Sequence, residues 1–173
     1  ALTDVSIRGG NSEQITVLLN GINICDAQTA HNTFDFPVDI SEIERIEVLE
    51  GPAGRVYGTS SLLGAINIVT KTPPSSSLSA RIEGGSYGYL SAGARANIAQ
   101  GHWNNQLSGS FTHSDGYLRN KVGRLNADYK TGKVFYQGNY NDDLIAVNWH
   151  AGMSVKDFGA NTFYAAKYDD QFE

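Results

Sequence analysis

Apolar and polar residues alternate over long stretches in the second half of the chain. The clearest stretch covers residues 145–156, and strict alternation of this kind is typical of a β-strand with two different faces. It reaches the roughly 9–11 residues that a strand needs to cross a membrane, whereas strands of globular proteins average about 5–6 residues. The length therefore favours the strands of a large barrel over those of a soluble sandwich. One face of this strand would consist of Ile145, Val147, Trp149, Ala151, Met153 and Val155.

The first half of the chain has a different pattern, in which short strands alternate with turns. Residues 15–19, 45–50 and 64–70 are rich in apolar or β-branched side chains and predict strands. Asn20–Gly21 predicts a tight turn, and Asp39 or Ser41 can cap a short helix that continues to Glu44. We therefore expect a small α+β domain with a mixed sheet and short helices.

The two patterns meet between residues 71 and 77, where two prolines and three serines interrupt any strand or helix. We expect a first domain in residues 1–72, a linker in residues 73–77 and a second domain in residues 78–173. The sequence begins at Ala1 without a signal peptide and ends without a clear terminator. We therefore expect a fragment that lacks the N-terminal part of its first domain.

The connections in the second domain also alternate, between short turns and long loops. Residues 101–105 and 141–143 predict short turns, residues 114–133 and 156–173 predict long loops, and residues 84–89 predict a shorter loop. Outer-membrane barrels have short periplasmic turns and longer extracellular loops, so the long loops would face outward. Aromatic residues near the strand ends fit interfacial girdles and equally fit ordinary strand composition; these are Tyr87, Tyr89, Trp103 and Tyr117.

Composition excludes several classes of protein. The 173 residues carry a net charge of −5 without a cluster of lysine and arginine, which argues against nucleic-acid binding. The single cysteine, Cys25, excludes an internal disulfide framework and a cysteine-rich metal site. The four histidines are far apart in the sequence, and no set of residues typical of a catalytic site is present. We therefore expect no metal, no cofactor and no enzymatic activity.

Five motifs follow one another in the first domain: Val5–Gly10, Val17–Ile22, Asp35–Pro37, Ile43–Gly58 and Gly64–Lys71. In this combination they closely resemble the plug domain of TonB-dependent outer-membrane receptors, of which residues 3–71 would form the larger part. The strands after the linker are similar to the first barrel strands of these receptors. Residues 156–164 further resemble Bacteroides-type members, some of which look like cobalamin receptors.

The resemblance implies an α+β plug domain followed by antiparallel strands of an incomplete transmembrane β-barrel, of the plugged type with about 22 strands. It implies TonB-dependent uptake of a scarce ligand, cobalamin or a ferric siderophore, across the outer membrane of a Gram-negative bacterium. TonB would bind a segment upstream of Ala1 that this sequence lacks, and the outer-membrane lipid would surround the strands. Because the sheet of a fragment has open edges, the isolated chain is expected to self-associate. The alternative is a soluble β-rich binding or adhesion module whose strands form a sandwich.

The resemblance also implies roles for individual residues. Outward loops of the plug and one barrel loop would contact the ligand, although polar loops without a binding role are an open alternative. These candidates are Asp26, Gln28, His31, Asn32, Arg55, Tyr57, Phe158, Asn161 and Tyr164. Charged residues and glycines of the motifs would instead hold the plug in the barrel and form its turns. They are Arg8, Gly9, Gly10, Glu44, Arg45, Glu47, Glu50, Gly51, Gly54, Gly58 and Gly64.

Overall fold

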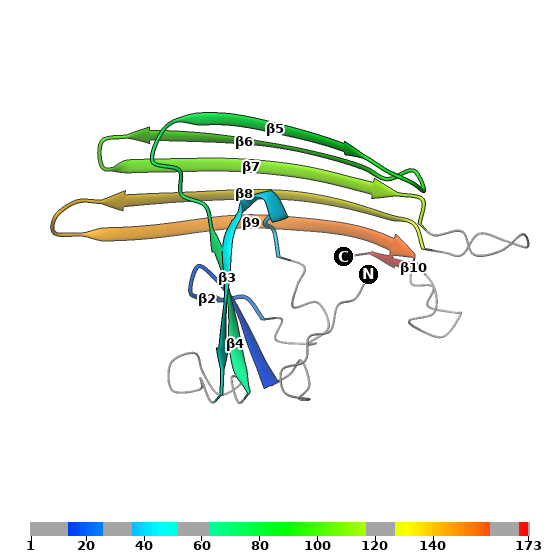
Figure 1. Ribbon diagram of the computed structural model, residues 1–173, viewed down its shortest axis with the longest axis horizontal. Helices are drawn as coiled ribbons and strands as arrows, with labels where there is room; N and C mark the ends of the chain where they lie inside the picture. The colour runs from blue at the N-terminus through cyan, green and yellow to red at the C-terminus, as the bar shows by residue number, and fades with distance from the viewer. Residues whose placement is uncertain (1–13, 26–35, 52–62, 117–126, 160–169, 173) are drawn as a thin grey trace, which may run out of the picture. The chain divides into compact units, whose positions relative to one another are not determined.

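The computed structural model describes residues 14–25, 36–51, 63–116, 127–159 and 170–172 (Figure 1). The chain divides into two compact units. The first contains residues 2–36 and 40–71, and the second contains residues 37–39 and 72–173 together with residue 1. The domain limits expected from the sequence remain predictions, and each unit is described by itself.

The first unit contains a four-stranded mixed sheet in the order β2-β1-β4-β3. β1 and β4 run parallel, whereas β2 pairs with β1 and β3 pairs with β4 in antiparallel fashion. β1 is buried along its whole length, as expected for an apolar strand with a neighbour on each side. The strands are β1 (Ile15–Leu19), β2 (Ile22–Asn23), β3 (Ile43–Glu50) and β4 (Gly64–Thr70).

The predicted strands of this unit are confirmed, with one change at the start of β3. The helix expected to continue to Glu44 is a 3-10 helix of Ile40–Glu42 only. It ends early because Ile43 already pairs with Thr70 in the sheet. β-branched side chains such as that of Ile43 favour strands, so this residue extends β3 by two residues beyond its predicted start.

The predicted turn at Asn20–Gly21 is also confirmed. Both residues have positive φ angles, 51° and 83°, as a type I′ hairpin turn between β1 and β2 requires. The Asn20 side chain donates to Thr70 Oγ1 at 2.9 Å and accepts from the Thr70 amide at 2.9 Å. The turn is therefore fastened to the end of β4, fifty residues further along the chain.

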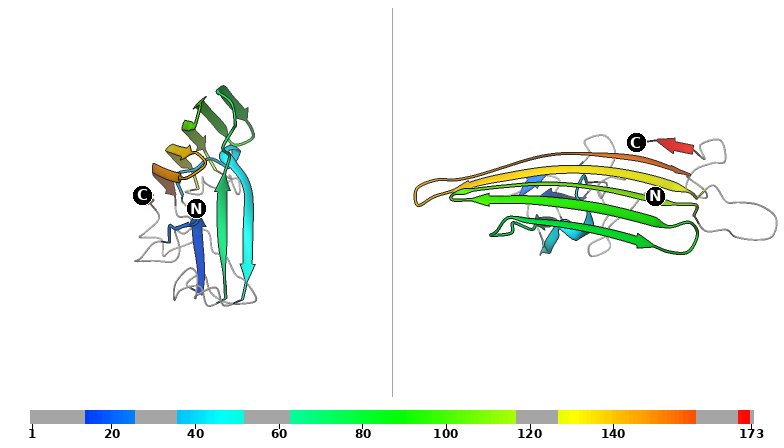
Figure 2. Two further views of the ribbon diagram at one scale, coloured as in Figure 1. Left: turned by 90° about the vertical axis from the view of Figure 1, so that its left-hand side faces the viewer. Right: turned by 90° about the horizontal axis from the view of Figure 1, so that it is seen from above.

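The second unit contains a six-stranded antiparallel sheet in the order β10-β9-β8-β7-β6-β5. Figure 2 shows β5 to β9 lying side by side in chain order. β9 has 14 residues and β8 has 13, lengths that exceed those of ordinary globular strands. The strands are β5 (Ser77–Gly84), β6 (Leu90–Gln100), β7 (Trp103–Ser114), β8 (Tyr129–Asn141), β9 (Ala146–Gly159) and β10 (Asp170–Phe172).

The predicted connections of this sheet needed correction because the strands are longer than the alternation indicated. Trp103 already pairs with Gln100 and Tyr140, so the turn after β6 contains only residues 101–102. The long loops predicted at residues 114–133 and 156–173 are also shorter, since β8 begins at Tyr129 and β9 continues to Gly159. The connection predicted at residues 84–89 is confirmed between β5 and β6.

The two faces of this sheet differ in polarity, as the alternation predicted. One face, called the apolar face below, exposes large side chains such as Leu107, Val134 and Met153, which is 62% exposed. The opposite polar face carries Gln106 and Gln137, which are opposite each other in β7 and β8. Of the helices in the described ranges, none is long and apolar enough to cross a membrane.

Candidate functional site

Most of the residues predicted to contact a ligand lie outside the described part of the chain. Phe158 is described, and it lies in β9 rather than in the loop where the sequence placed it. It is only 4% exposed, and Lys156 Nζ lies 5.0 Å from the centre of its ring. A role in ligand binding stays a prediction for Phe158 and for the others, which are Asp26, Gln28, His31, Asn32, Arg55, Tyr57, Asn161 and Tyr164.

The charged residues predicted to hold the first domain in place form a cluster on β3 and β4. Arg45 donates from Nε to Glu47 at 2.8 Å and from Nη1 to Glu44 at 3.0 Å. Asn67 on β4 donates to the second Glu47 oxygen at 2.8 Å. The hydrogen bond from Asn67, followed by that from Arg45, lowers the pKa of Glu47 below its ordinary value. The cluster thus links two neighbouring strands of one sheet.

The remaining residues of this predicted set are described only in part. Gly51 has a φ of 95°, which favours glycine, and its amide donates to the Leu63 carbonyl at 3.0 Å. Glu50 and Gly64 are opposite each other in β3 and β4. The proposed roles of all these residues stay predictions, and those outside the described residues are Arg8, Gly9, Gly10, Gly54 and Gly58.

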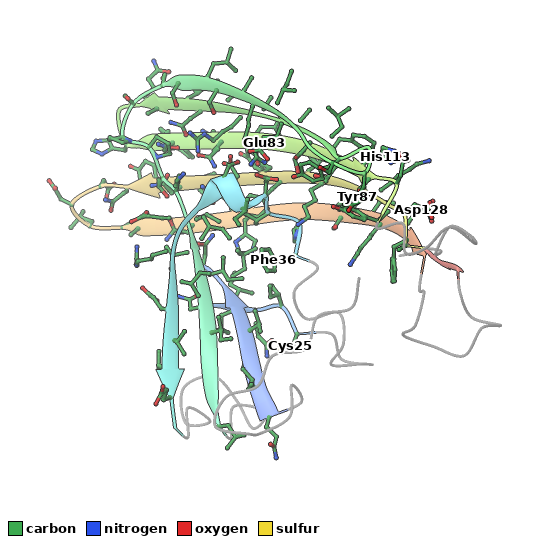
Figure 3. All side chains as sticks on the ribbon, turned by 45° about the vertical axis from the view of Figure 1, so that its right-hand side comes forward. Cys25, Phe36, Glu83, Tyr87, His113 and Asp128 are labelled. Atoms are coloured by element: carbon green, nitrogen blue, oxygen red, sulfur yellow. The ribbon has the colours of Figure 1, made fainter. Side chains whose placement is uncertain are left out.

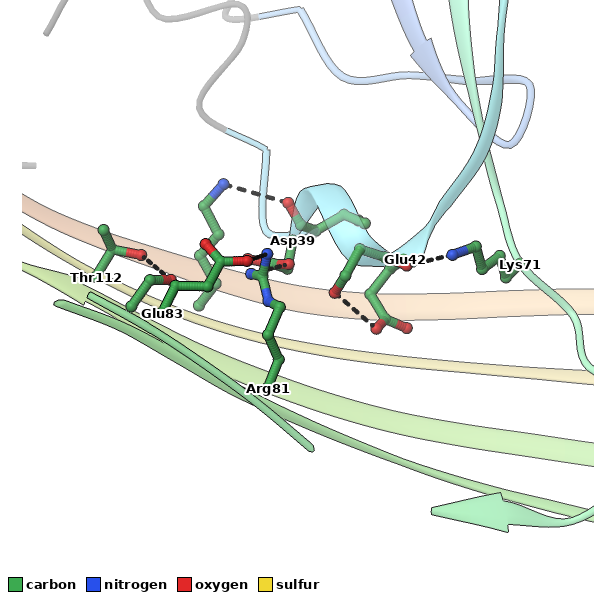
Figure 4. A network of polar contacts seen from close by, with 10 residues as sticks. Asp39, Glu42, Lys71, Arg81, Glu83 and Thr112 are labelled. Atoms are coloured by element: carbon green, nitrogen blue, oxygen red, sulfur yellow. Dashed lines mark hydrogen bonds and ion pairs between the residues drawn. The ribbon is translucent and has the colours of Figure 1, made fainter. Parts of the chain in front are cut away.

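A more developed site lies on the polar face of the six-stranded sheet (Figure 4). Arg81 on β5 donates from Nη2 to Asp39 Oδ1 at 2.8 Å and from Nη1 to Glu83 Oε1 at 2.9 Å. The Arg81 and Asp39 side chains are 30% and 16% exposed, so this ion pair is partly shielded from water. Lys133 on β8 donates to the Val38 carbonyl at 3.2 Å. Two cations from separate strands therefore bind adjacent residues of one short segment.

The same segment packs against the sheet at Gly152, which has no side chain. Gly152 is opposite Phe135 in β9 and β8. A methyl group on Gly152 would lie 2.6 Å from the Pro37 ring and 2.9 Å from the Phe135 ring. The segment is thus in close contact with the sheet, and Val38 within it is completely buried. We call the residues of the sheet that receive Pro37–Asp39 the Arg81–Lys133 site; they are Arg81, Lys133, Phe135 and Gly152.

This site was not predicted from the sequence, although one local sign of it is visible there. Asp39 or Ser41 is predicted to cap a short helix, and the Asp39 carboxylate binds Arg81, which is 42 residues away in the sequence. That local sign is the position of Arg81 in an alternating strand, which indicates that its side chain lies on the polar face of the sheet. Within the described residues, no three His, Cys, Asp or Glu side chains are grouped to hold a metal ion.

The end of the sheet near residues 84–89 carries a strained turn (Figure 3). Tyr87 has a φ of 59°, which non-glycine residues rarely adopt. Its carbonyl accepts from the Asp115 amide at 2.8 Å and from Ser114 Oγ at 3.2 Å. Gly88 has a φ of 66°, which favours glycine, and a Cβ there would require the Asp115 carboxylate to move. These contacts fasten the turn to the end of β7.

The opposite end of the sheet carries an aromatic cluster and a shallow pocket. Trp103 lies 4.8 Å from Tyr140 and 6.1 Å from Trp149, measured between ring centres. Trp149 Nε1 donates to the Tyr136 hydroxyl at 3.3 Å. The pocket, with a volume of about 230 Å³, is formed by the segment 72–74, the turn at residues 101–102 and the neighbouring ends of β6, β7 and β8. Its lining is mostly uncharged and includes Pro73, His102, Asn104, Asn139 and Asn141.

Comparison with known proteins identifies relatives of both units. Residues 1–65 match the family model of the TonB-dependent Receptor Plug Domain. The chain is 30% identical to the vitamin B12 transporter BtuB of Vibrio vulnificus (strain CMCP6), in an alignment that covers 92% of this chain and 27% of BtuB. It also resembles the ferric yersiniabactin uptake receptor FyuA of Yersinia pestis, with a TM-score of 0.68 at 22% identity over 91% of this chain and 26% of FyuA. The copper transporter OprC gives a TM-score of 0.71 at 15% identity over 91% of this chain and 26% of OprC.

The chain spans about a quarter of the length of these relatives. The two solved structures are less than 25% identical to it, and they show its fold. The matched region includes β1, β2 and β3, and the six-stranded sheet follows it in the sequence. Residues 1–65 therefore belong to the TonB-dependent receptor plug domain family, and the chain has the fold of such a plug followed by the first barrel strands of these receptors.

Proposed function

We propose that this chain is part of an outer-membrane receptor for the TonB-dependent uptake of a small, scarce ligand. The receptor takes up its ligand unchanged, so it requires no catalytic residue. In this proposal β5 to β9 belong to a barrel that crosses the outer membrane, and residues 1–71 belong to the plug domain of the same receptor. TonB would act through a segment that precedes Ala1.

The apolar face of the six-stranded sheet is the observation that carries this proposal. Trp103 and Phe111 both lie on it, eight residues apart in β7, which corresponds to about 27 Å along a strand. With a strand tilt of about 40°, the same stretch spans roughly 21 Å of membrane thickness, close to the ≈25 Å apolar band of outer-membrane barrels. The apolar face is therefore suited to contact with membrane lipid.

The rival proposal, a soluble sandwich, conflicts with the exposure of the same face. In a sandwich these side chains would pack against a second sheet. Instead Val147 and Val155 are 47% and 40% exposed, and Met153 between them is more exposed still. An exposed apolar surface of this extent is unfavourable in water, so we favour the barrel.

Cobalamin is the ligand that we favour. The vitamin B12 transporter of Vibrio vulnificus aligns with almost the whole of this chain, across both units. A ferric siderophore is the second candidate, because the solved structures that share this fold include a ferric yersiniabactin receptor. The ligand would bind the outward loops of the plug, where His31 and Tyr57 are the leading candidates.

Uptake by the full-length receptor tests this function. The receptor is expressed in a Gram-negative strain without its own cobalamin receptor, and the entry of labelled cobalamin and of ferric siderophores is measured with and without TonB. We expect cobalamin uptake that requires TonB. Uptake of a siderophore but not of cobalamin would show that the ligand is a siderophore. Uptake that is independent of TonB would contradict the mechanism.

Two substitutions test the ligand contacts. His31→Ala and Tyr57→Ala should weaken cobalamin binding to the purified receptor, because each removes a side chain able to hydrogen-bond or stack with the ligand. Leu78→Ala is the matched control, since Leu78 is 81% exposed on β5 and far from any proposed ligand contact in the sequence. Unchanged binding in both variants would show that these loops do not hold the ligand.

A further inference from the structure

A chain of hydrogen bonds crosses the apolar face of the six-stranded sheet near its short turns. Trp149 Nε1 donates to the Tyr136 hydroxyl at 3.3 Å, and this hydroxyl donates to Asn105 Oδ1 at 2.7 Å. The chain ends at the Asn105 NH2 group, for which the described residues offer no acceptor. We propose that Asn105 donates to the glycerol ester of a phospholipid in the periplasmic leaflet of the outer membrane. This inference rests on the proposed function, in which the apolar face contacts lipid, and it assigns one lipid to a defined place on that face.

Three side chains converge over one glycine to position this donor. Asn105 on β7 is opposite Gly138 on β8, which is opposite Trp149 on β9. A Cβ at Gly138 would lie 2.4 Å from the Trp149 indole, so the indole lies over the glycine. Tyr136, also on β8, brings its hydroxyl between Trp149 and Asn105. Because the Asn105 oxygen is held by this hydroxyl, the NH2 group is left as the donor at the end of the chain.

The depth of Asn105 on this face matches that of the lipid ester carbonyls. Asn105 shares the apolar face with Leu107, and Trp103 lies on the same face nearer the turn. Tryptophan rings at the boundary of a membrane lie at the level of the lipid headgroups. Asn105 is then about 7 Å further along the strand, or roughly 5 Å deeper at a strand tilt of about 40°. An amide donor without an acceptor is costly at this depth, and ester carbonyls are the acceptors that the lipid provides there.

Two carboxylates lie beyond Asn105, in the short turn between β8 and β9 (Figure 1). Asp142 is held in place, because its Oδ2 accepts from the Tyr140 hydroxyl at 2.7 Å and its Oδ1 accepts from two backbone amides of the turn. Asp143 beside it is exposed and has no partner among the described residues. Asp142 lies about 13 Å along the strand from Gly138, or roughly 10 Å further out at the same tilt. The turn therefore lies on the headgroup side of the ester.

The charges at this end of the sheet favour a lipid with a positively charged amine in its headgroup. An ammonium group beside Asp142 and Asp143 is attracted, whereas a headgroup of net negative charge is repelled. The lysines and arginines of β5 to β9 lie in the middle of their strands or nearer the other end, and they are Arg81, Arg95, Lys130, Lys133 and Lys156. The site therefore suits a zwitterionic aminophospholipid better than an anionic phospholipid.

Binding of phosphatidylethanolamine to the purified full-length receptor tests the ester contact. The receptor is titrated in detergent, and native mass spectrometry resolves each successive bound lipid. Asn105→Leu should weaken one binding step about fivefold and leave the others unchanged, because it removes a hydrogen bond of ordinary strength. Asn139→Leu, the same exchange on the polar face of β8, is the matched control. Electrophoretic mobility before heating confirms that each barrel is folded, and equal titrations of the parent and Asn105→Leu would then overturn the proposal.

A second titration tests the headgroup. Phosphatidylglycerol, which carries a net negative charge, should bind at the same step about threefold more weakly than phosphatidylethanolamine, as expected for an exposed ion pair. Asp143→Asn should remove this preference. Asp157→Asn should retain it, because Asp157 is exposed on the same face near the opposite end of β9. Equal binding of the two lipids to the parent would overturn the assignment of the headgroup.

Uptake measurements on the same variants separate this inference from the proposed function. Cobalamin uptake by a receptor whose lipid titration is unaffected by Asn105→Leu would overturn the lipid site alone. A receptor that loses the binding step in Asn105→Leu, but takes up no ligand in the presence of TonB, would support the lipid site and contradict the proposed function.

Discussion

Asn67 shows how one side chain joins parts of the plug sheet that are distant in the sequence. Its Nδ2 donates to Glu47 on the neighbouring strand at 2.8 Å, and its Oδ1 accepts from the Gly21 amide at 2.9 Å. The amide side chain thus connects the β1–β2 turn with the charged cluster of β3. An aspartate there would lose the donor, and it would place a second negative charge beside Glu47.

Asn67→Ala should therefore raise the pKa of Glu47 toward its ordinary value of about 4.3. The pKa of Glu47 is lowered in the folded state, so its contribution to stability is present above the unfolded pKa and is lost as the pH falls through the folded pKa. The variant should accordingly be less stable than the parent at neutral pH, with a smaller difference in acid. Thermal unfolding across pH 3–7, a range chosen to bracket about 4.3, measures this. Thr70→Val is the control, because it alters the same turn and leaves Glu47 with its donor.

Gly138 gives a second prediction at this scale. A Cβ at this position would lie 2.4 Å from the Trp149 indole on the neighbouring strand. Gly138→Ala should therefore displace the indole, break its hydrogen bond to Tyr136 and destabilise the receptor by about 1–3 kcal/mol, as overpacking does. Tryptophan fluorescence in a Trp103→Phe background reports the displacement. An unchanged spectrum would show that the ring has room to accommodate the methyl group.

Contacts at this scale were the least predictable from sequence. The turn at Asn20–Gly21 was predicted because its signal is local, but the bonds from Asn20 to Thr70 were not. The local pattern predicted only a helix cap for Asp39 or Ser41, because a cap depends on residues that are close together in the sequence. The ion pair between Asp39 and Arg81 could not be predicted, because it forms only when two segments that are distant in the sequence are placed together.

The strands and their faces, in contrast, could be predicted well. Alternation determines which side chains share a face, and it correctly placed Leu107, Met153 and Val155 on the exposed apolar face. The ends of the strands were predicted less well, because a strand continues for as long as its neighbour offers a partner. Residues 156–159 have the polar and glycine-rich composition of a loop, but they pair with β8 and β10.

The position of the membrane boundary leads to a prediction for the strands. Met153 lies near the middle of β9 on the apolar face, whereas Gln100 lies on the same face at the turn end of β6. Met153→Lys should destabilise the full-length receptor in lipid by about 2–4 kcal/mol, and Gln100→Lys by about 0–1 kcal/mol, because the cost of a charge depends on its depth. Urea unfolding in lipid vesicles provides the comparison. Equal costs at the two positions would contradict the proposed membrane boundary.

At the scale of the whole molecule, the order of the motifs was more informative than any single residue. Val17–Ile22, Ile43–Gly58 and Gly64–Lys71 predicted the receptor family, and each includes a strand of the plug sheet or a turn beside one. The ligand could not be predicted in the same way. Ligand contacts depend on loop side chains whose spacing follows no strand or helix period, and most of the candidates lie outside the described residues.

The last prediction concerns a protein that consists of these 173 residues alone. Among the described strands, β5 pairs only with β6, so one edge of the sheet has unpaired backbone donors and acceptors. The adjoining apolar face carries Leu78 and Ile82 on β5, which are 81% and 79% exposed. Both features promote association in water, so the protein should form oligomers whose size grows with concentration.

Light scattering after gel filtration, with and without detergent, measures this association. Detergent should reduce the oligomers, because its acyl chains cover the apolar face in place of a second molecule. Replacing Leu78 and Ile82 by lysine should have the same effect without detergent, because it replaces exposed apolar side chains of this face by charged ones. The same replacements at Ser79 and Glu83, which lie on the other face of β5, provide the control. A monodisperse monomer at high concentration without detergent would show that this apolar face is stable in water, and it would revive the soluble sandwich as the better account of the second unit.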